Sequence, residues 1–327
     1  MTRSSVPPPV TQVLDAAQSW LPRRMAAVER RLGDVVADGG ALLAAEAGAT
    51  LAAGGKRLRP MLVLVCAGAG AGDGAVRAAT AIELVHMATL VHDDVLDAAP
   101  LRRGRPTVVA RAGRSTATAV GDLLFSRAFA QLAGDDEGSE RRVALLARAS
   151  VGLAQGELAQ RRDAFDVSIS AERYFERCRL KTAQLFECAC LIGAEPGADW
   201  ARALRTYGRE IGLAFQLLDD VLDVTGPPSR TGKALGTDLL DGTVTLPLIL
   251  ARERDPGLAS LDLRALDQPA AEAACERIAA TGVLDAVRAD ARRRVEAAKA
   301  MLEAAPADGR RRELLTMVAD GVVERYA

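Results

Sequence analysis

The sequence contains few aromatic residues: phenylalanine, tyrosine and tryptophan together make up 3% of its 327 residues. β-Branched residues seldom alternate with polar ones, so the pattern of a half-buried strand is rare. Strand-like segments never alternate with long helical ones, which argues against a parallel α/β sheet, and no repeat of roughly 20–50 residues indicates a solenoid. Alanine and leucine instead recur at three- and four-residue spacing, as amphipathic helices require. We therefore expect an all-α fold.

The chain also lacks a charge surplus. Lysine and arginine number 42 and aspartate and glutamate 43, which gives a net charge of −1. This balance removes the electrostatic reason to expect nucleic acid or an anionic membrane as the main partner. The best apolar run, residues 61–71, is shorter than the roughly 20 residues of a membrane span, and the N-terminus lacks the apolar segment of a signal peptide. We expect a cytoplasmic protein with no integral membrane segment and no nucleic-acid partner.

Cysteines are few and scattered, and no pair has the spacing of metal ligands. Cys188 and Cys190 lie two positions apart in an apolar helical segment, so their side chains diverge. We expect all the cysteines to be small, reduced residues of the core. They are Cys66, Cys178, Cys188, Cys190 and Cys275.

Helical periodicity extends over almost the whole chain, and turn residues separate its segments. No linker rich in proline, glycine or serine divides it, so we expect a single all-α domain over residues 1–327, with residues 1–10 disordered. The long helices that the periodicity predicts span about residues 73–97, 116–132, 140–163, 171–192, 198–224 and 284–302.

One pentapeptide, Asp-Asp-Val-Leu-Asp, occurs twice, each time at the end of a predicted helix after an apolar run. Its first and fifth residues are neighbours on one helix face, so their carboxylates repel each other and the negative end of the helix dipole. A solvated acidic helix end explains one such cluster more easily than two matching ones. A divalent cation removes the repulsion, and hard oxygen ligands without histidine or thiolate suit Mg²⁺. We therefore expect two magnesium-binding clusters that hold one diphosphate between them: Asp93, Asp94 and Asp97, and Asp219, Asp220 and Asp223.

Lysine is scarce, since only four of the 42 basic residues are lysines. A lysine retained in so arginine-rich a chain is a candidate for a position that needs a compact ammonium group. Lys56 follows the pair Gly54-Gly55, which lets backbone N–H groups approach an anion closely. Lys181 lies within a predicted helix, and Lys233 follows the second acidic cluster. Lys299 is expected at the surface.

Further polar residues gather around the first acidic cluster. Arg102 and Arg103 follow it, and the planar fork of arginine binds phosphate oxygens in pairs. Both histidines of the chain, His86 and His92, precede it. A lone histidine in such a position is more often structural than a ligand.

Taken in order, these motifs resemble those of the trans-type polyprenyl diphosphate synthases. The likeness covers about residues 51–250 and rests on several independent motifs. The motifs are Gly-Gly-Lys-Arg-Leu-Arg-Pro from Gly54, His86, the two Asp-Asp-x-x-Asp clusters, Arg102-Arg103, Gly121-Asp122, Gly156-Glu157 with Gln160, Lys181-Thr182, Phe215-Gln216, Lys233, Asp238 and Thr245-Leu246-Pro247.

The resemblance implies an all-α fold around a deep central cavity, usually in a homodimer, and a prenyltransferase that condenses isopentenyl diphosphate head-to-tail with an allylic diphosphate. It also implies residue roles. The ligands of the Mg²⁺ ions that bridge the allylic diphosphate would be Asp93, Asp94, Asp97 and Asp219, with Asp223 in an outer shell. The other contacts to that diphosphate would come from Arg102, Lys181 and Lys233. The residues that hold isopentenyl diphosphate would be Lys56, Arg59, His86 and Arg103. Those that face the developing carbocation would be Thr182 and Gln216.

Two features of the sequence bear on substrate binding and product length. The family commonly has a lysine two residues before Thr-Leu-Pro, where this chain has Thr243. In members with short products, an aromatic residue four or five positions before the first aspartate closes the product pocket. Here those positions are Thr89 and Ala88, and Val85 lies on the same helix side as Thr89. Because none of them is bulky, we expect a product longer than geranylgeranyl diphosphate.

Other functions are weighed against this one. The chain could be a short-chain synthase that makes farnesyl or geranylgeranyl diphosphate, or a non-catalytic subunit of a heteromeric synthase, for which Thr243 is the only hint. A terpene cyclase is disfavoured because its second metal motif normally carries Asn/Asp, Ser/Thr and Glu at wider spacing, and because aromatics are few here. A carboxylate-bridged di-iron bundle is disfavoured because the sequence has no Glu-x-x-His pair.

Overall fold

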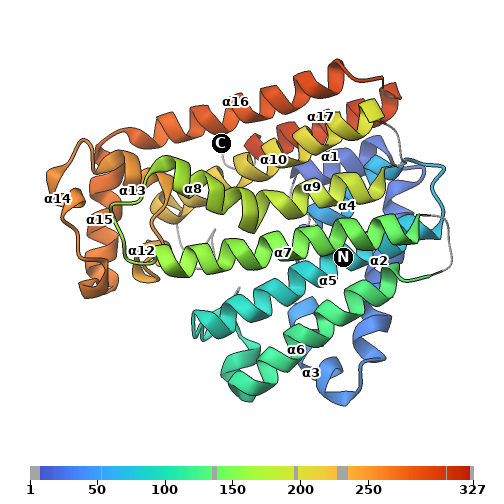
Figure 1. The fold of residues 1–327 in the computed structure, drawn as a ribbon, viewed down its shortest axis with the longest axis horizontal. Helices are drawn as coiled ribbons and strands as arrows, with labels where there is room; N and C mark the ends of the chain where they lie inside the picture. Colours follow the sequence, from blue (N-terminus) through green and yellow to red (C-terminus); the bar gives the residue numbers. More distant parts are fainter. Residues whose placement is uncertain are drawn as a thin grey trace.

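The computed structural model describes residues 8–52, 54–102, 104–134, 138–194, 198–226, 235–306 and 308–324. It confirms the all-α prediction, since helices make up nearly all of the ordered secondary structure (Figure 1). The helices of the first half are α1 (Pro8–Ala16), α2 (Leu21–Ala37), α3 (Ala41–Ala52), α4 (Leu58–Ala67), α5 (Asp73–Leu96), α6 (Val108–Leu132) and α7 (Ser139–Asp163). Those of the second half are α8 (Ala171–Cys178), η2 (Arg179–Ala183), α9 (Gln184–Gly193), α10 (Ala198–Thr225), α12 (Thr237–Leu240), α13 (Leu246–Ala251), α14 (Pro256–Ala259), η3 (Leu263–Ala265), α15 (Gln268–Ala280), α16 (Val283–Glu303) and α17 (Gly309–Glu324).

Helix α5 lies in the middle of the bundle, where it packs against α2, α4, α6 and α9. It is long and apolar enough to cross a membrane, but 67% of its most apolar window is buried inside the fold. It is the only such helix among the described residues, and burial on most sides is typical of a core helix. The sequence analysis predicted this helix but did not identify it as one long apolar segment, because the buried polar residues Thr80 and Glu83 interrupt its apolar run.

The chain turns sharply after α5 and returns to it. The strands β1 (Leu101–Arg102) and β2 (Arg105–Pro106) form a short antiparallel hairpin in which Arg102 faces Arg105. Helix α6 then begins after Thr107, whose hydroxyl accepts a hydrogen bond from the Ala110 N–H at 3.2 Å. The hairpin therefore carries Arg102 back over the C-terminal end of α5. The neighbouring Arg103 lies outside the described residues.

Helices α5, α7 and α10 all end at the same end of the bundle, beside the shorter helices α12 to α15 (Figure 1). Helix α10 packs along α9 and α16, which anchors it over most of its length. The two acidic clusters sit at the C-terminal ends of α5 and α10. The fold therefore brings them to one end of the molecule, although 126 positions separate Asp93 from Asp219.

The helix that the periodicity predicts over residues 171–192 is interrupted. Residues Arg179–Ala183 form a π turn, η2, between α8 and α9. Helix α7 packs very closely against this turn, because a Cβ atom added to Gly156 would lie 2.6 Å from the backbone nitrogen of Lys181. π turns commonly occur at functional sites. Here the turn contains Lys181 and Thr182, two of the residues singled out by the sequence.

Several further predictions can be compared with the structure. Helix α1 includes residues 8–10, whereas residues 1–7 lie outside the described part. All the cysteines are buried and free, which confirms their assignment to the core. One continuous apolar core extends from Val10 in α1 to Val322 in α17.

Candidate functional site

An open cavity of about 790 Å³, including the solvent at its mouth, lies where α5, α7 and α10 end. We call it the acidic cavity. It joins residues that are far apart in the sequence, including members of both acidic clusters. Its lining residues are Asp93, Asp97, Arg102, Gln160, Tyr174, Arg177, Cys178, Lys181, Thr182, Gln216, Asp220, Asp238, Asp241, Thr243 and Thr245.

The first acidic cluster splits between two environments. Asp93 and Asp97, one helical turn apart, both line the acidic cavity. Asp94 is rotated about 100° from Asp93 around the helix. Its carboxylate is 4% exposed and accepts a hydrogen bond from Arg102 Nε at 2.8 Å. The structure thus brings two of the three expected carboxylates together and pairs the third with an arginine.

Ion pairs connect the carboxylates of this cluster. Lys181 Nζ lies 3.7 Å from Asp93 Oδ1 and also pairs with Glu157. Arg161 Nη2 donates to Asp97 Oδ1 at 2.6 Å, and its Nε donates to Glu157 Oε1 at 2.8 Å. Glu157 therefore links two cations, each of which faces one carboxylate of the cluster.

Arg161 was missed in the sequence. The chain has 38 arginines, and Arg161 is directly followed by another one. The presence of an arginine at this position therefore does not by itself indicate a functional residue. The only available signals were its i,i+4 spacing from Glu157, which favours an ion pair on one helix face, and its position next to Gln160.

Electrostatic interactions in this part of the cavity keep Lys181 positively charged. Burial raises the pKa of Asp93, against the opposing effect of Lys181. Burial by itself would lower the pKa of Lys181, but Asp93 and Glu157 outweigh it and raise that pKa above its usual value. Lys181 is therefore a stable cation beside the two carboxylates, which is the charge needed to attract a phosphate group.

The three aspartates of the second cluster have three different surroundings. Asp219 is exposed. Asp220 is 1% exposed, and burial with the nearby Asp238 raises its pKa well above the usual range. Asp223 Oδ2 accepts a hydrogen bond from the backbone N–H of Asp238 at 3.1 Å, in the first turn of α12. Of the three, only Asp220 lines the acidic cavity.

Two carboxylates outside the repeated motif line the same cavity. Asp238 was part of the sequence pattern, whereas Asp241 was not singled out. Both come from the segment around α12, three residues apart. The sequence signal for Asp241 was weak because a single acid beside a glycine is typical of an ordinary turn.

Thr182 and Gln216, which were predicted to act together, are in contact. Thr182 Oγ1 donates to Gln216 Oε1 at 2.7 Å. Thr182 belongs to the π turn and Gln216 to α10, so the contact joins two separate elements across the cavity wall. Lys233, the remaining residue of the predicted catalytic set, lies outside the described residues.

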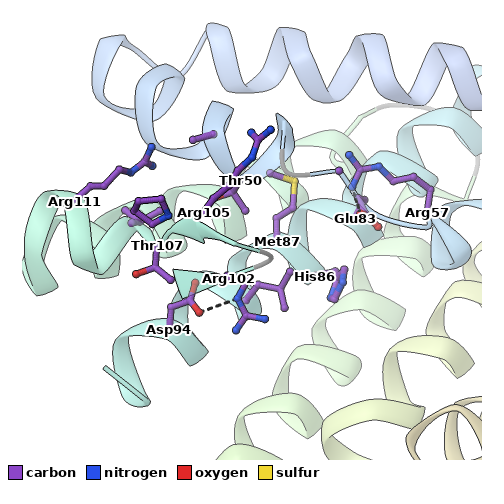
Figure 2. Close-up of a pocket in the computed structure, with 15 residues that line it drawn as sticks. Thr50, Arg57, Glu83, His86, Met87, Asp94, Arg102, Arg105, Thr107 and Arg111 are labelled. Atoms are coloured by element: carbon purple, nitrogen blue, oxygen red, sulfur yellow. Dashed lines mark hydrogen bonds and ion pairs between the residues drawn. The ribbon is translucent and has the colours of Figure 1, made fainter. Parts of the chain in front are cut away.

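A second cavity, of about 830 Å³, lies between the basic loop before α4, the middle of α5 and the β1–β2 hairpin (Figure 2). Arg57 and Glu83 lie together at one end of it and Arg111 at the other (Figure 2). His86 and Arg102, both expected at a diphosphate, line it. Arg102 lines the acidic cavity as well, so it stands between the two.

The basic loop and the start of α4 direct two arginines, Arg57 and Arg59, to different places. Arg57, not Arg59, reaches the second cavity, where it pairs with Glu29 at 2.6 Å and with Glu83 at 2.5 Å. The guanidinium of Arg59 lies over the Phe186 ring, 4.5 Å from its centroid. Burial lowers the pKa of Arg59 to about 10.

Lys56 and Arg59 are not among the residues that line the second cavity. Arg57 has a φ of 48°, a left-handed backbone conformation that an arginine rarely adopts.

The three residues expected to set product length lie inside the bundle. Val85 and Ala88 are fully buried in the core. Thr89 donates its hydroxyl proton to the carbonyl of His86 at 2.8 Å. None of the three lines either of the two cavities.

The donor set of the acidic cavity fits a hard divalent cation. Its carboxylate oxygens come from Asp93, Asp97, Asp220, Asp238 and Asp241, and it contains no histidine. Within the part of the chain that the structure describes, no three such groups already converge into a closed metal cage. Carboxylates that face an open cavity suit Mg²⁺ or Ca²⁺, which complete their coordination with water or substrate oxygens.

Known proteins are similar to this chain in sequence and in fold. The family model described as Polyprenyl synthetase matches residues 41–280. The heptaprenyl diphosphate synthase component 2 of Geobacillus stearothermophilus is 41% identical over 243 residues, which cover 73% of this chain and 75% of that protein. The geranylgeranyl diphosphate synthase of Methanosarcina mazei is 36% identical over 245 residues, which cover 72% of this chain and 75% of that one.

A solved structure agrees over nearly the whole chain. It is a polyprenyl synthase from Caulobacter crescentus, complexed with calcium and isoprenyl diphosphate. The two folds superpose with a TM-score of 0.87 at 36% identity, over 97% of this chain and 98% of that one.

Proposed function

The chain belongs to the polyprenyl synthetase family of prenyltransferases, and we propose that it condenses isopentenyl diphosphate head-to-tail with an allylic diphosphate in an Mg²⁺-dependent reaction. The observation that carries the proposal is the acidic cavity. Carboxylates from α5, α10 and the α12 segment face one another there, with the Lys181 ammonium beside them. Such a cavity can hold a diphosphate through divalent cations and a fixed positive charge at once.

We propose that Asp93 and Asp97 bind Mg²⁺ on one side of the allylic diphosphate, with Asp219 on the other side. When bound, the metal stabilises the negative charge that develops on the departing diphosphate. Lys181 and Arg102 contact the same diphosphate, and Lys233 completes this set by its place in the family motif. The other three aspartates support the site: Asp94 pairs with Arg102, Asp220 accepts a hydrogen bond from Gln216, and Asp223 accepts one from the Asp238 backbone.

The departing diphosphate leaves an allylic carbocation. Thr182 and Gln216 place oxygen dipoles beside it, which stabilises its positive charge. The alkene of isopentenyl diphosphate attacks the cation, which forms a carbon–carbon bond and a new cationic centre. A proton then leaves a carbon next to that centre, and the electrons of the broken C–H bond form the double bond of the product. We propose that the diphosphate accepts this proton, because neither a histidine nor a glutamate is among the described residues that line the acidic cavity.

Isopentenyl diphosphate is proposed to enter through the second cavity. His86 and Arg102 line it, and Lys56, Arg59 and Arg103 belong to the same set by the family motif. Arg102 separates the two cavities, so its guanidinium is within reach of either diphosphate.

We propose that the product is longer than geranylgeranyl diphosphate. The small residues Val85, Ala88 and Thr89 leave no aromatic barrier behind Asp93. A relative that makes heptaprenyl diphosphate supports this length, whereas a geranylgeranyl diphosphate synthase among the relatives represents the alternative. Ala88→Phe should shorten the product, and an unchanged product distribution would count against this assignment.

We also propose that the enzyme works in the cytoplasm as a homodimer. The free, buried thiols fit a reducing compartment. Val151 and Leu158 on α7 are 58% and 70% exposed. Because they are seven positions apart, about two helical turns, they lie on one helix face that a second copy could cover. The alternative is a heteromer, since the Geobacillus relative is named component 2. Light scattering of the purified chain distinguishes a homodimer from a lone subunit.

Product analysis tests the function directly. The chain is incubated with Mg²⁺, isopentenyl diphosphate and, separately, dimethylallyl, geranyl, farnesyl and geranylgeranyl diphosphate. Products beyond geranylgeranyl support both the synthase and the long product, whereas a stop at farnesyl or geranylgeranyl supports the short-chain alternative. No elongation with any primer would favour a non-catalytic subunit, with Thr243 as the first residue to restore to lysine.

A further inference from the structure

A chain of hydrogen bonds runs along the wall of the acidic cavity from α8 to the π turn. Tyr174 Oη donates to Asp220 Oδ2 at 2.5 Å, and Gln216 Nε2 donates to Asp220 Oδ1 at 2.7 Å. Thr182 Oγ1 then donates to Gln216 Oε1 at 2.7 Å. Tyr174 and Asp220 are each 1% exposed. Both oxygens of Asp220 therefore accept hydrogen bonds from the protein itself.

Only one orientation of the Gln216 amide satisfies this chain. Gln216 turns its NH₂ group toward Asp220, whose Oδ1 accepts the hydrogen bond. The amide oxygen then faces Thr182 and takes up the proton of its hydroxyl group. A flipped amide would place two acceptors against each other in a buried site, which is costly.

The orientation of the Gln216 amide affects the cavity through Thr182. Because its only hydroxyl proton points at Gln216, the free lone pairs of its oxygen are turned elsewhere. A hydroxyl that pointed its proton into the cavity would place a partial positive charge there. The direction of the hydrogen-bond chain thus decides which end of the Thr182 dipole is available to a bound molecule.

We propose that Asp220 is a positioning residue that fixes the Gln216 amide and, through it, presents the oxygen of Thr182 to the allylic cation. This inference rests on the proposed function, in which Thr182 and Gln216 face that cation. It assigns the second aspartate of the repeated pentapeptide a role different from that of a metal ligand. Tyr174 holds the other carboxylate oxygen of Asp220, Oδ2, in place.

Asparagine at position 220 separates the two roles. Asp220→Asn keeps an oxygen that can accept from Gln216 but removes the charge that a metal ligand needs. We expect this variant to keep its half-saturating Mg²⁺ concentration and most of its kcat. Asp220→Ala, which removes the acceptor, should lose about 10²-fold in kcat. The KM values for both diphosphates and the half-saturating Mg²⁺ concentration should stay unchanged.

Two further variants separate positioning from a loss of stability. Tyr207→Phe removes an equally buried phenol hydrogen bond, from Tyr207 Oη to the Leu315 carbonyl at 2.7 Å, outside the acidic cavity. It should lower the melting temperature but leave kcat unchanged. Combining Asp220→Ala with Gln216→Leu should cost no more kcat than Gln216→Leu alone, since Asp220 acts through Gln216.

Hydrogen exchange provides a readout that needs neither metal nor substrate. The side-chain amide resonances of Gln216, identified by their absence in Gln216→Leu, should exchange slowly in the wild type and in Asp220→Asn but faster in Asp220→Ala. Unchanged exchange in Asp220→Ala, a raised Mg²⁺ requirement in Asp220→Asn, or additive losses in the double variant would each overturn the proposal. A wild-type chain that exchanges as expected but transfers no prenyl group would instead refute the proposed function.

Discussion

Replacing Arg161 with methionine should tighten divalent-cation binding at the first acidic cluster. Arg161 Nη2 donates to Asp97 Oδ1 at 2.6 Å, so this guanidinium competes with a metal ion for the negative charge of Asp97. The two side chains are 38% and 28% exposed, and a pair so exposed contributes about 0.2–1 kcal/mol. Removing the competing cation should therefore lower the dissociation constant about 1.4- to 5-fold.

Electron paramagnetic resonance with Mn²⁺, which prefers the same oxygen ligands as Mg²⁺, measures this constant without substrate. The matched control is Arg162→Met, which removes the same charge. Its side chain is 69% exposed and pairs with Asp163 at 3.4 Å instead of Asp97. An unchanged or weaker Mn²⁺ affinity in Arg161→Met, or equal changes in both variants, would refute the reasoning.

Three other predictions concern the fold. Gly156→Ala should destabilise the protein by about 1–3 kcal/mol, because the added Cβ would lie 2.6 Å from a backbone nitrogen of the π turn. Gly33→Ala, with no atom within 4 Å of its added Cβ, should stabilise it by about 0.4–1 kcal/mol; thermal melts check both. Burial alone would raise the pKa of Asp163, but hydrogen bonds from Arg173 lower it. A carboxylate whose pKa is lower in the folded state stabilises the fold above about pH 4. This stabilisation is lost as the pH falls through the folded-state pKa. Arg173→Gln should therefore lower the melting temperature at pH 7 but not at about pH 2, and an equal loss at both would contradict this. Burial raises the pKa of Cys188 to about 12, so iodoacetamide should leave this thiol unlabelled in the folded protein at pH 8, as mass spectrometry would show.

The sequence predicted the fold class and the place of the acidic cavity because both depend on local patterns. Helical periodicity is visible in one chain, and a repeated acidic pentapeptide indicates a shared ligand without any knowledge of packing. The same pattern failed to separate Asp93 from Asp94. Both are acids at a helix end, and only the packing of α5 decides that one faces the acidic cavity while the other meets Arg102.

Other parts of the site depend on contacts between elements. The π turn is invisible to a periodicity argument, because one wider turn does not disturb the apolar pattern on either side. It follows from the approach of α7 at Gly156, which only the tertiary structure contains. The different positions of Arg57 and Arg59 have a similar cause, since the acids that hold Arg57 come from α2 and α5.

The π turn also limits how this chain can vary in length. Deleting one residue from Arg179–Ala183 would restore ordinary α-helical hydrogen bonding, but it would rotate α9 by about 100° relative to α8. Tyr174 on α8 and Phe186 on α9 are both fully packed, so they could not keep their partners together after such a rotation. The extra residue thus acts as an insertion that two neighbouring helices now require. Homologous chains with this cavity should conserve the residue count between these helices more strictly than the residues themselves.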